Sequence, residues 1–205
     1  MPVCLYLRGC PGSGKNTVAR LLERDLGWPR LWVHHFDAIY RVIGEYKCPE
    51  LTDDLILSTA TYLMHDKQDF MIVRPTRSAW GMDKVASHAR VRGYTFVPVR
   101  LTASYNVLVT RVTRRWSESP FRLTTKEALD EYLGARPESE FPGEHVIDTD
   151  KLTPEQVAGR IKELLPGVEK PGPCGVQFGL WTCYKPHGHT DCHLGTSKEN
   201  GLRSW

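Results

Sequence analysis

The sequence predicts an α/β fold, a five-stranded parallel sheet flanked by helices, with a small Cys/His-rich C-terminal element. Three observations predict it. Short apolar runs alternate with stretches of helical spacing, a glycine-rich loop joins the first run to the first such stretch, and Pro and Gly end this alternation after Leu165. Strands that alternate with helices of about 10 to 15 residues require a parallel sheet covered on both faces.

The expected elements follow in order along the chain. Apolar runs predict strands at residues 3–7, 31–36, 70–73, 95–101 and 145–147. Apolar residues at helical spacing predict helices at residues 16–26, 53–64, 82–91, 105–116 and 154–165. We expect Thr52 to cap the second helix, because its hydroxyl can accept a hydrogen bond from a free backbone N–H.

Composition narrows the function classes. The 40% hydrophobic and 25% charged residues are ordinary for a globular protein. The net charge of +3 is too small for a protein that binds nucleic acid over most of its surface. No apolar stretch approaches the roughly 18 to 20 residues that a membrane span requires, so we expect no membrane partner. The N-terminus runs directly into the glycine loop without a signal segment, which predicts a cytoplasmic protein.

The segment after Leu165 has a different composition from the rest. It opens with Pro166-Gly167 and Pro171-Gly172-Pro173, which favour turns, so we divide the chain into residues 1–168 and 169–205. Three of the six cysteines fall in this tail together with three histidines. In a reducing compartment such a cluster indicates metal ligands before it indicates disulfides.

The spacing within the tail predicts a structural Zn²⁺ site. The pattern Cys174-x8-Cys183-x5-His189-x3-His193 supplies four nitrogen and sulfur ligands over a short span. His187 is an alternative ligand, as is Cys192, and a disordered tail with incidental cysteines is the competing interpretation. The spacing also resembles the Cys-x8-Cys-x5-Cys-x3-His zinc fingers that bind RNA, with a histidine in place of the third cysteine.

The glycine loop carries the clearest chemistry in the sequence. Gly9-x4-Gly14-Lys15 follows a predicted strand and opens a predicted helix, which is the context of a P-loop (Walker A) that cradles phosphates with backbone N–H groups. The form resembles the Gly-x-Pro-Gly-x-Gly-Lys-x-Thr loop of adenylate-kinase-like enzymes, which implies ATP and Mg²⁺. The expected nucleotide contacts are Gly9, Gly12, Ser13, Gly14, Lys15, Asn16 and Thr17. Asn16 stands where Ser or Thr ordinarily ligates magnesium, so its metal contact is left open.

A wider set of residues resembles bacteriophage-type polynucleotide 5′-kinases over about residues 3–165. The set comprises the glycine loop, Asp37 followed by Tyr40-Arg41, and the basic run 108–115. The resemblance implies that Lys15 and Arg115 stabilise the transferring phosphate, that Asp37 accepts the proton of the attacking hydroxyl, and that Arg41 holds the acceptor phosphate. A cytoplasmic, phage-encoded chain would fit this resemblance.

These roles are consistent with the chemistry of phosphoryl transfer. The reaction mainly requires positioned reactants, neutralised phosphate charge and a base beside the attacking hydroxyl. Two interpretations stay open for Asp37, because aspartate is also a favoured helix N-cap. Arg111, which we expect to contact the nucleotide, lies with Arg114 at a helix end, where a solvated basic face is the alternative. Arg74 and Arg77 follow the third strand, at the edge where open α/β sheets bind ligands, and are acceptor-binding candidates.

The predicted function is therefore an ATP-dependent kinase that phosphorylates a hydroxyl of a nucleic acid or nucleotide. Hydroxymethylated bases of phage DNA, nucleoside monophosphates and small alcohols are the alternative acceptors. A different class is also open, a non-catalytic nucleotide-binding module whose zinc tail mediates interactions, because a P-loop alone specifies no acceptor. The Asn-Lys-x-Asp run of guanine-nucleotide switches does not occur.

Overall fold

The computed structural model describes residues 1–32, 49–75, 79, 81–114, 123–135 and 139–167, and four short strands between 177 and 204. Five strands form the main sheet: β1 (Val3–Gly9), β2 (Arg30–Trp32), β3 (Phe70–Arg74), β4 (Thr95–Thr102) and β5 (His145–Asp148). Their order is β2-β3-β1-β4-β5, and every neighbouring pair is parallel. The predicted five-stranded parallel sheet is confirmed.

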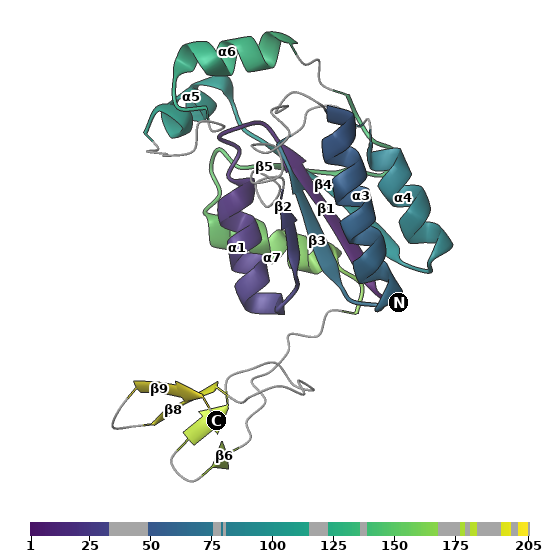
Figure 1. Ribbon diagram of the computed structural model, residues 1–205. Coiled ribbons are helices and arrows are strands. Elements are labelled where there is room, and N and C mark those ends of the chain that lie inside the picture. Colours follow the sequence, from purple (N-terminus) through teal and green to yellow (C-terminus); the bar gives the residue numbers. More distant parts are fainter. Residues whose placement is uncertain are drawn as a thin grey trace.

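Helices cover both faces of this sheet. They are α1 (Lys15–Leu26), α3 (Pro49–His65), α4 (Met82–Val91), α5 (Tyr105–Thr113), α6 (Lys126–Ala135) and α7 (Pro154–Leu164). In Figure 1, α1 and α7 lie on one face and α3 and α4 on the other, while α5 and α6 lie beyond the carboxyl ends of the strands. These ends are where open α/β folds bind ligands.

The alternation of side chains along β1 explains the two hydrophobic cores. Successive strand residues point to opposite faces, so Leu5 and Leu7 join the core under α1 and α7, while Cys4 and Tyr6 join the core under α3 and α4. All seven residues of β1 are buried, as expected for the central strand of a parallel sheet with both faces covered. The strand that leads into the glycine loop is therefore rigidly held.

Three expectations about element boundaries need correction. Thr52 does not cap α3, because the helix begins at Pro49 and already includes it. The predicted helix at residues 105–116 ends at Thr113, with Arg114 as its C-cap. The helix α6 was not predicted from the sequence, although Leu129, Tyr132 and Leu133 have helical spacing. The second strand is described only as far as Trp32.

A second sheet occupies the C-terminal segment. It contains β6 (Gln177–Phe178), β7 (Trp181–Cys183), β8 (Leu194–Ser197) and β9 (Gly201–Ser204) in that order, all antiparallel. Their backbone is described and their side chains are not. The proposed domain boundary at 168 follows the end of α7, and residues 168–176 lie outside the described part of the chain. Among the helices that are described, none is both long and apolar enough to span a bilayer.

Candidate functional site

The glycine loop connects β1 to α1 and passes close to two neighbouring elements. A Cβ atom on Gly9 would lie 2.4 Å from the carbonyl oxygen of Leu101 on β4, and one on Gly12 would lie 3.0 Å from that of Leu108 on α5. Gly12 has a φ of 92°, in the region that only glycine adopts readily. These two positions therefore need glycine for space as well as for backbone conformation.

The N-terminus of α1 is arranged to receive an anion. Gly14 caps the helix in the left-handed conformation, without a side-chain capping bond. The first N–H groups of a helix have no partner within it, and the helix dipole adds partial positive charge there. Lys15 is 6% exposed and its Nζ donates to the carbonyl oxygen of Cys10 at 3.0 Å. The loop thus combines N–H donors, a dipole and a cation, which together suit phosphate groups.

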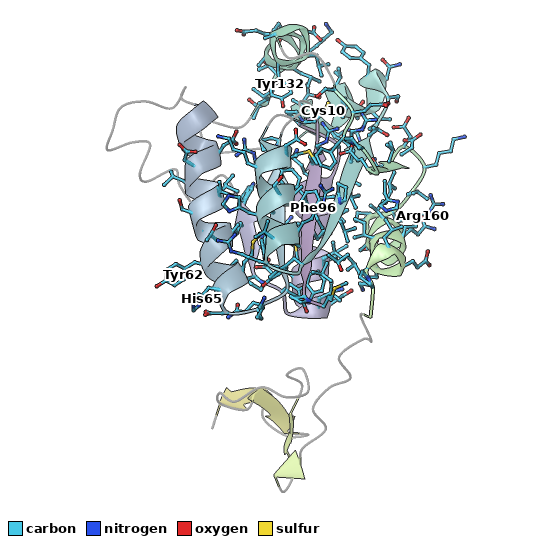
Figure 2. All side chains as sticks on the ribbon, turned by 90° about the vertical axis from the view of Figure 1, so that its right-hand side faces the viewer. Cys10, Tyr62, His65, Phe96, Tyr132 and Arg160 are labelled. Atoms are coloured by element: carbon cyan, nitrogen blue, oxygen red, sulfur yellow. The ribbon has the colours of Figure 1, made fainter. Side chains whose placement is uncertain are left out.

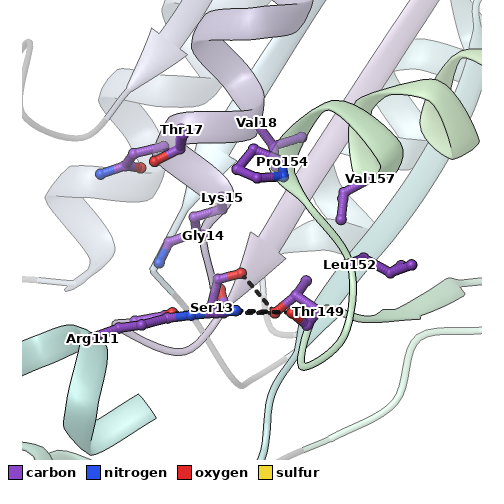
Figure 3. A pocket seen from close by; sticks show the side chains of 12 residues that line it. Ser13, Gly14, Lys15, Thr17, Val18, Arg111, Thr149, Leu152, Pro154 and Val157 are labelled. Carbon is purple, nitrogen blue, oxygen red and sulfur yellow. Dashed lines mark hydrogen bonds between the residues drawn. The ribbon is translucent and has the colours of Figure 1, made fainter. Parts of the chain in front are cut away.

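A cavity of about 410 Å³ opens beside this loop (Figure 3). Its lining brings together residues from the glycine loop, α1, α5 and the segment from β5 into α7: Gly12, Ser13, Gly14, Lys15, Asn16, Thr17, Val18, Arg111, Thr149, Leu152, Pro154 and Val157. Cationic and polar groups occupy the loop side, and an apolar wall of Leu152, Pro154 and Val157 lies at the other end. A molecule with an anionic part and a flat apolar part matches this division.

Arg111 forms one boundary of the cavity. Its Nη1 donates to the hydroxyl of Thr149 and its Nη2 to the carbonyl oxygen of Thr149, both at 2.8 Å, while Nη1 also lies 3.4 Å from the carbonyl oxygen of Gly12. The alternative of a solvated basic face does not hold for Arg111, because its guanidinium is partly buried against these groups. Arg114, by contrast, is exposed.

Two buried polar atoms of the loop have no hydrogen-bond partner among the described residues, the Ser13 Oγ and the Asn16 Oδ1. A buried acceptor without a partner is costly and calls for an explanation such as a ligand or ion. Magnesium prefers oxygen ligands, and an amide oxygen is one of them. Asn16 therefore fits a magnesium ion next to the phosphates despite the absence of the usual hydroxyl.

Comparison with known proteins points to the same architecture. No family model matches the chain, and no curated protein matches its sequence. Among solved structures it is similar to a putative kinase from Chloroflexus aurantiacus, with a TM-score of 0.61 and 17% identity over 80% of this chain and 98% of that one. It is also similar to the Mycobacterium tuberculosis APS kinase in complex with AMPPNP and APS, with a TM-score of 0.61 and 18% identity over 80% and 96%.

A gluconokinase from Sinorhizobium meliloti gives a third match, with a TM-score of 0.56 and 17% identity over 80% of this chain and 95% of that one. The chain has the P-loop kinase fold. At these identities the likeness shows the fold alone, and the residues of this chain must carry any argument about its activity.

β3 lies next to β1, the strand that leads into the glycine loop, and β3 ends in Arg74. The register pairs Arg74 with Arg8, the residue before Gly9. Arg74 is paired with a carboxylate, because its Nη2 lies 2.5 Å from Oδ1 of Asp53, which α3 supplies.

Two further arginines continue this row across the sheet. Arg8 is fully buried and its Nε and Nη2 bind the two carboxylate oxygens of Glu144 at 2.5 and 2.6 Å, while Nη2 also donates to the carbonyl oxygen of Ser139. Arg100 lies in register with Arg8 and within 3.4 Å of the same carboxylate. This paired network anchors the segment before β5 to the strand that carries the glycine loop.

Several predicted site residues lie outside the described residues. They are Asp37, Arg41, Arg77 and Arg115 on the acceptor and lid side, and Cys174, His189 and His193 in the tail. Of Cys183 only the backbone is described, at the end of β7. In the part of the chain with described side chains, no group of three or more His, Cys, Asp or Glu residues is arranged to hold a metal ion.

Sequence reasoning missed Thr149 and Asp53. Thr149 follows β5 directly, and a polar residue just after a strand of a parallel sheet is a signal that could have found it. Asp53 gave no such signal, because it lies within a helix among other polar residues. Only the packing of α3 onto the end of β3 brings its carboxylate to Arg74.

Proposed function

We propose that this chain is an ATP-dependent kinase that transfers the γ-phosphate to a hydroxyl of a nucleic acid or nucleotide, in the manner of polynucleotide 5′-kinases. The observation that carries the proposal is the cavity that joins the glycine loop to the apolar wall of Leu152, Pro154 and Val157. The phosphates of ATP fit the N–H groups and Lys15 at one end. The adenine fits between Arg111 and the apolar wall at the other.

We assign a separate role in the reaction to each residue around the glycine loop. Lys15 and the N-terminus of α1 neutralise phosphate charge, and Arg111 holds Gly12 and Thr149 around the nucleotide. Magnesium bound to ATP supplies further charge neutralisation, and Asn16 would hold it through Oδ1. On the acceptor side we propose Asp37 as the proton acceptor, with Arg41, Arg74 and Arg77 binding the acceptor and Arg115 closing over the phosphate.

A cationic side chain at the end of β3 supports the proposed class of acceptor. Arg74 ends the strand next to β1, and two of its guanidinium nitrogens have no partner among the described residues, which favours an acceptor that carries phosphate. The structural neighbours include a gluconokinase and an APS kinase bound to APS, so a sugar or an anionic nucleotide derivative is the alternative acceptor.

The test is transfer of labelled γ-phosphate from ATP to a panel of acceptors. The panel contains 5′-hydroxyl DNA and RNA, nucleosides, nucleoside monophosphates, hydroxymethylated DNA and gluconate, with Lys15→Ala as the control that loses a phosphate contact. Transfer to a 5′-hydroxyl polynucleotide by the native chain alone supports the proposal. ATP binding without transfer to any acceptor would instead support the non-catalytic binding module.

We also propose that the C-terminal segment binds Zn²⁺ through Cys174, Cys183, His189 and His193. Cys183 ends β7, and its backbone pairs with that of Gly195 on β8. Some thirty residues bury little core, and a metal would supply the missing stability. Elemental analysis should find stoichiometric zinc, lost in Cys183→Ser, and metal-free native protein would exclude the site.

A further inference from the structure

The ion pair between Asp53 and Arg74 lies at the carboxyl edge of the sheet, beside the glycine loop. The two side chains are 10% and 12% exposed. Arg74 uses Nη2 to reach Asp53, while its Nε and Nη1 are buried and have no hydrogen-bond partner in the described structure. A guanidinium presents its donors in a planar fork, so this one is only partly used.

A purely structural role explains this arrangement poorly. A buried ion pair is weak support for stability, since well-packed apolar residues of similar size often serve as well. Leaving two donors of a buried cation unpaired adds to that cost. Arg8, one strand away, shows what a structural arginine looks like in this protein, because it is fully buried and holds both oxygens of Glu144.

Asp53 is fixed from two sides. Its Oδ1 contacts Arg74, and its Oδ2 lies so close to Gly81 that a Cβ there would come within 2.7 Å of it. Gly81 caps α4, so the carboxylate also lies near the positive end of that helix dipole. Burial raises the pKa of Asp53, and the attraction of Arg74 opposes this rise, so the two charges depend on each other.

We infer that Asp53 is a positioning residue that holds Arg74 for an oxyanion of the phosphate acceptor, and so gives the site a preference for anionic acceptors. The inference rests on the proposed kinase function and deepens it. One oxygen of Asp53 occupies one arm of the guanidinium fork. Nη2 carries two hydrogens, so one reaches Asp53 while the other acts together with Nε or with Nη1 to bind an oxyanion through two hydrogen bonds.

The experiment follows the N–H signal of Arg74 Nε by NMR during titration with inorganic phosphate. The glycine loop is first saturated with magnesium and an ATP analogue whose γ-phosphate cannot be transferred, so that phosphate cannot bind there. Arg74→Lys assigns the signal by its loss. In the native chain we expect the Nε signal to shift saturably with phosphate, and an unresponsive signal would overturn the inference whether or not the variants fold.

Two neighbouring carboxylates provide a matched comparison. Asp53→Asn removes the charge beside Arg74, and Asp54→Asn removes the same charge from the next, exposed position of α3. We expect Asp53→Asn to weaken phosphate binding at Arg74 at least tenfold, about 1.4 kcal/mol, and Asp54→Asn to change it less than about twofold. Equal effects of the two variants would contradict the positioning role.

Measurements of transfer separate this inference from the proposed function. With an acceptor found by the transfer panel, Asp53→Asn should raise KM for that acceptor at least tenfold while leaving the affinity for ATP unchanged. If no acceptor is found, the proposed function fails, yet the phosphate titration still decides whether Asp53 positions Arg74. A general loss of ATP affinity in Asp53→Asn would show a merely structural role.

Discussion

Arg111 on α5 donates hydrogen bonds to both the hydroxyl and the backbone carbonyl of Thr149, each at 2.8 Å. The contact joins a helix beyond the carboxyl ends of the strands to the segment that follows β5. The same hydroxyl donates to the carbonyl oxygen of Thr102 at 3.0 Å, so Thr149 also ties this contact to β4. Arg111 and Thr149 therefore link α5, β4 and the segment after β5 at the edge of the proposed nucleotide cavity.

Arg111→Ala should weaken ATP binding about tenfold or more, because hydrogen bonds to a charged group contribute about 1.5 to 3 kcal/mol. A tenfold change corresponds to about 1.4 kcal/mol. Arg114→Ala, at the exposed C-cap of the same helix, is the matched control and should change the affinity less than about twofold. Titration with a fluorescent ATP analogue measures both, and similar affinities in the two variants would refute the role of Arg111.

Gly9→Ala should destabilise the fold and disrupt ATP binding, because the added methyl would meet the carbonyl oxygen of Leu101 at 2.4 Å. Overpacking of this kind costs about 1 to 3 kcal/mol. Gly134→Ala adds the same methyl on α6, where nothing lies within 4 Å, and should not destabilise the chain. Urea unfolding compares the two free energies, and an undisturbed Gly9→Ala variant would contradict the tight passage of the loop over β4.

Asn16→Ala should raise the magnesium concentration needed for half-maximal ATP binding, because it removes a buried oxygen that has no hydrogen-bond partner among the described residues. Asn16→Thr restores an oxygen of the kind that P-loops ordinarily use and should bring the requirement back towards the native value. The measurement is ATP binding across a magnesium series. An unchanged magnesium requirement in Asn16→Ala would exclude Asn16 as a ligand.

Asp37→Asn should lower kcat by about 100-fold or more if the carboxylate accepts the proton of the acceptor hydroxyl, with little change in ATP affinity. Asparagine caps helices about as well as aspartate, so a capping role predicts nearly native kcat. Transfer assays at saturating magnesium, with ATP binding measured separately, distinguish the two roles. They also answer the concern that a metal contact of Asp37 could imitate loss of the base.

The contact between Asp25 on α1 and Lys162 on α7 predicts a pH-dependent share of stability. The hydrogen bond from Lys162 is the main cause that holds the pKa of Asp25 below its ordinary value of 3.8, with a further contribution from Arg24. A lowered folded-state pKa gives stability that is full above 3.8 and is lost as pH falls through the folded value.

Lys162→Gln should therefore lower the free energy of unfolding by up to about 1 kcal/mol at neutral pH, the usual range for a partly exposed pair. The difference from the native chain should begin to shrink below about pH 4, where the carboxyl of Asp25 becomes protonated in the unfolded chain. Urea unfolding at several pH values measures it. A difference that stays constant down to acidic pH would show that the contact contributes through packing alone.

Local pattern was enough to predict the sheet and the glycine loop. The five strands are short apolar runs, and Gly9-x4-Gly14-Lys15 stands between a strand and a helix, so periodicity and residue type specify them within a few positions. The predicted contact of Arg111 with the nucleotide stays a prediction, although the structure places its guanidinium at the cavity that the loop forms. The helix α6 was not predicted, although Leu129, Tyr132 and Leu133 have helical spacing.

The pairings between charged groups were decided by tertiary structure alone. Arg8 lies 136 positions from Glu144, and Arg111 lies 38 from Thr149, so no local pattern links them. The sequence by itself determined the fold class and a phosphate-binding loop, because both depend on residues close along the chain. Only the packing of α3 against β3 gave Arg74 its partner Asp53, since that contact exists once burial has brought distant segments together.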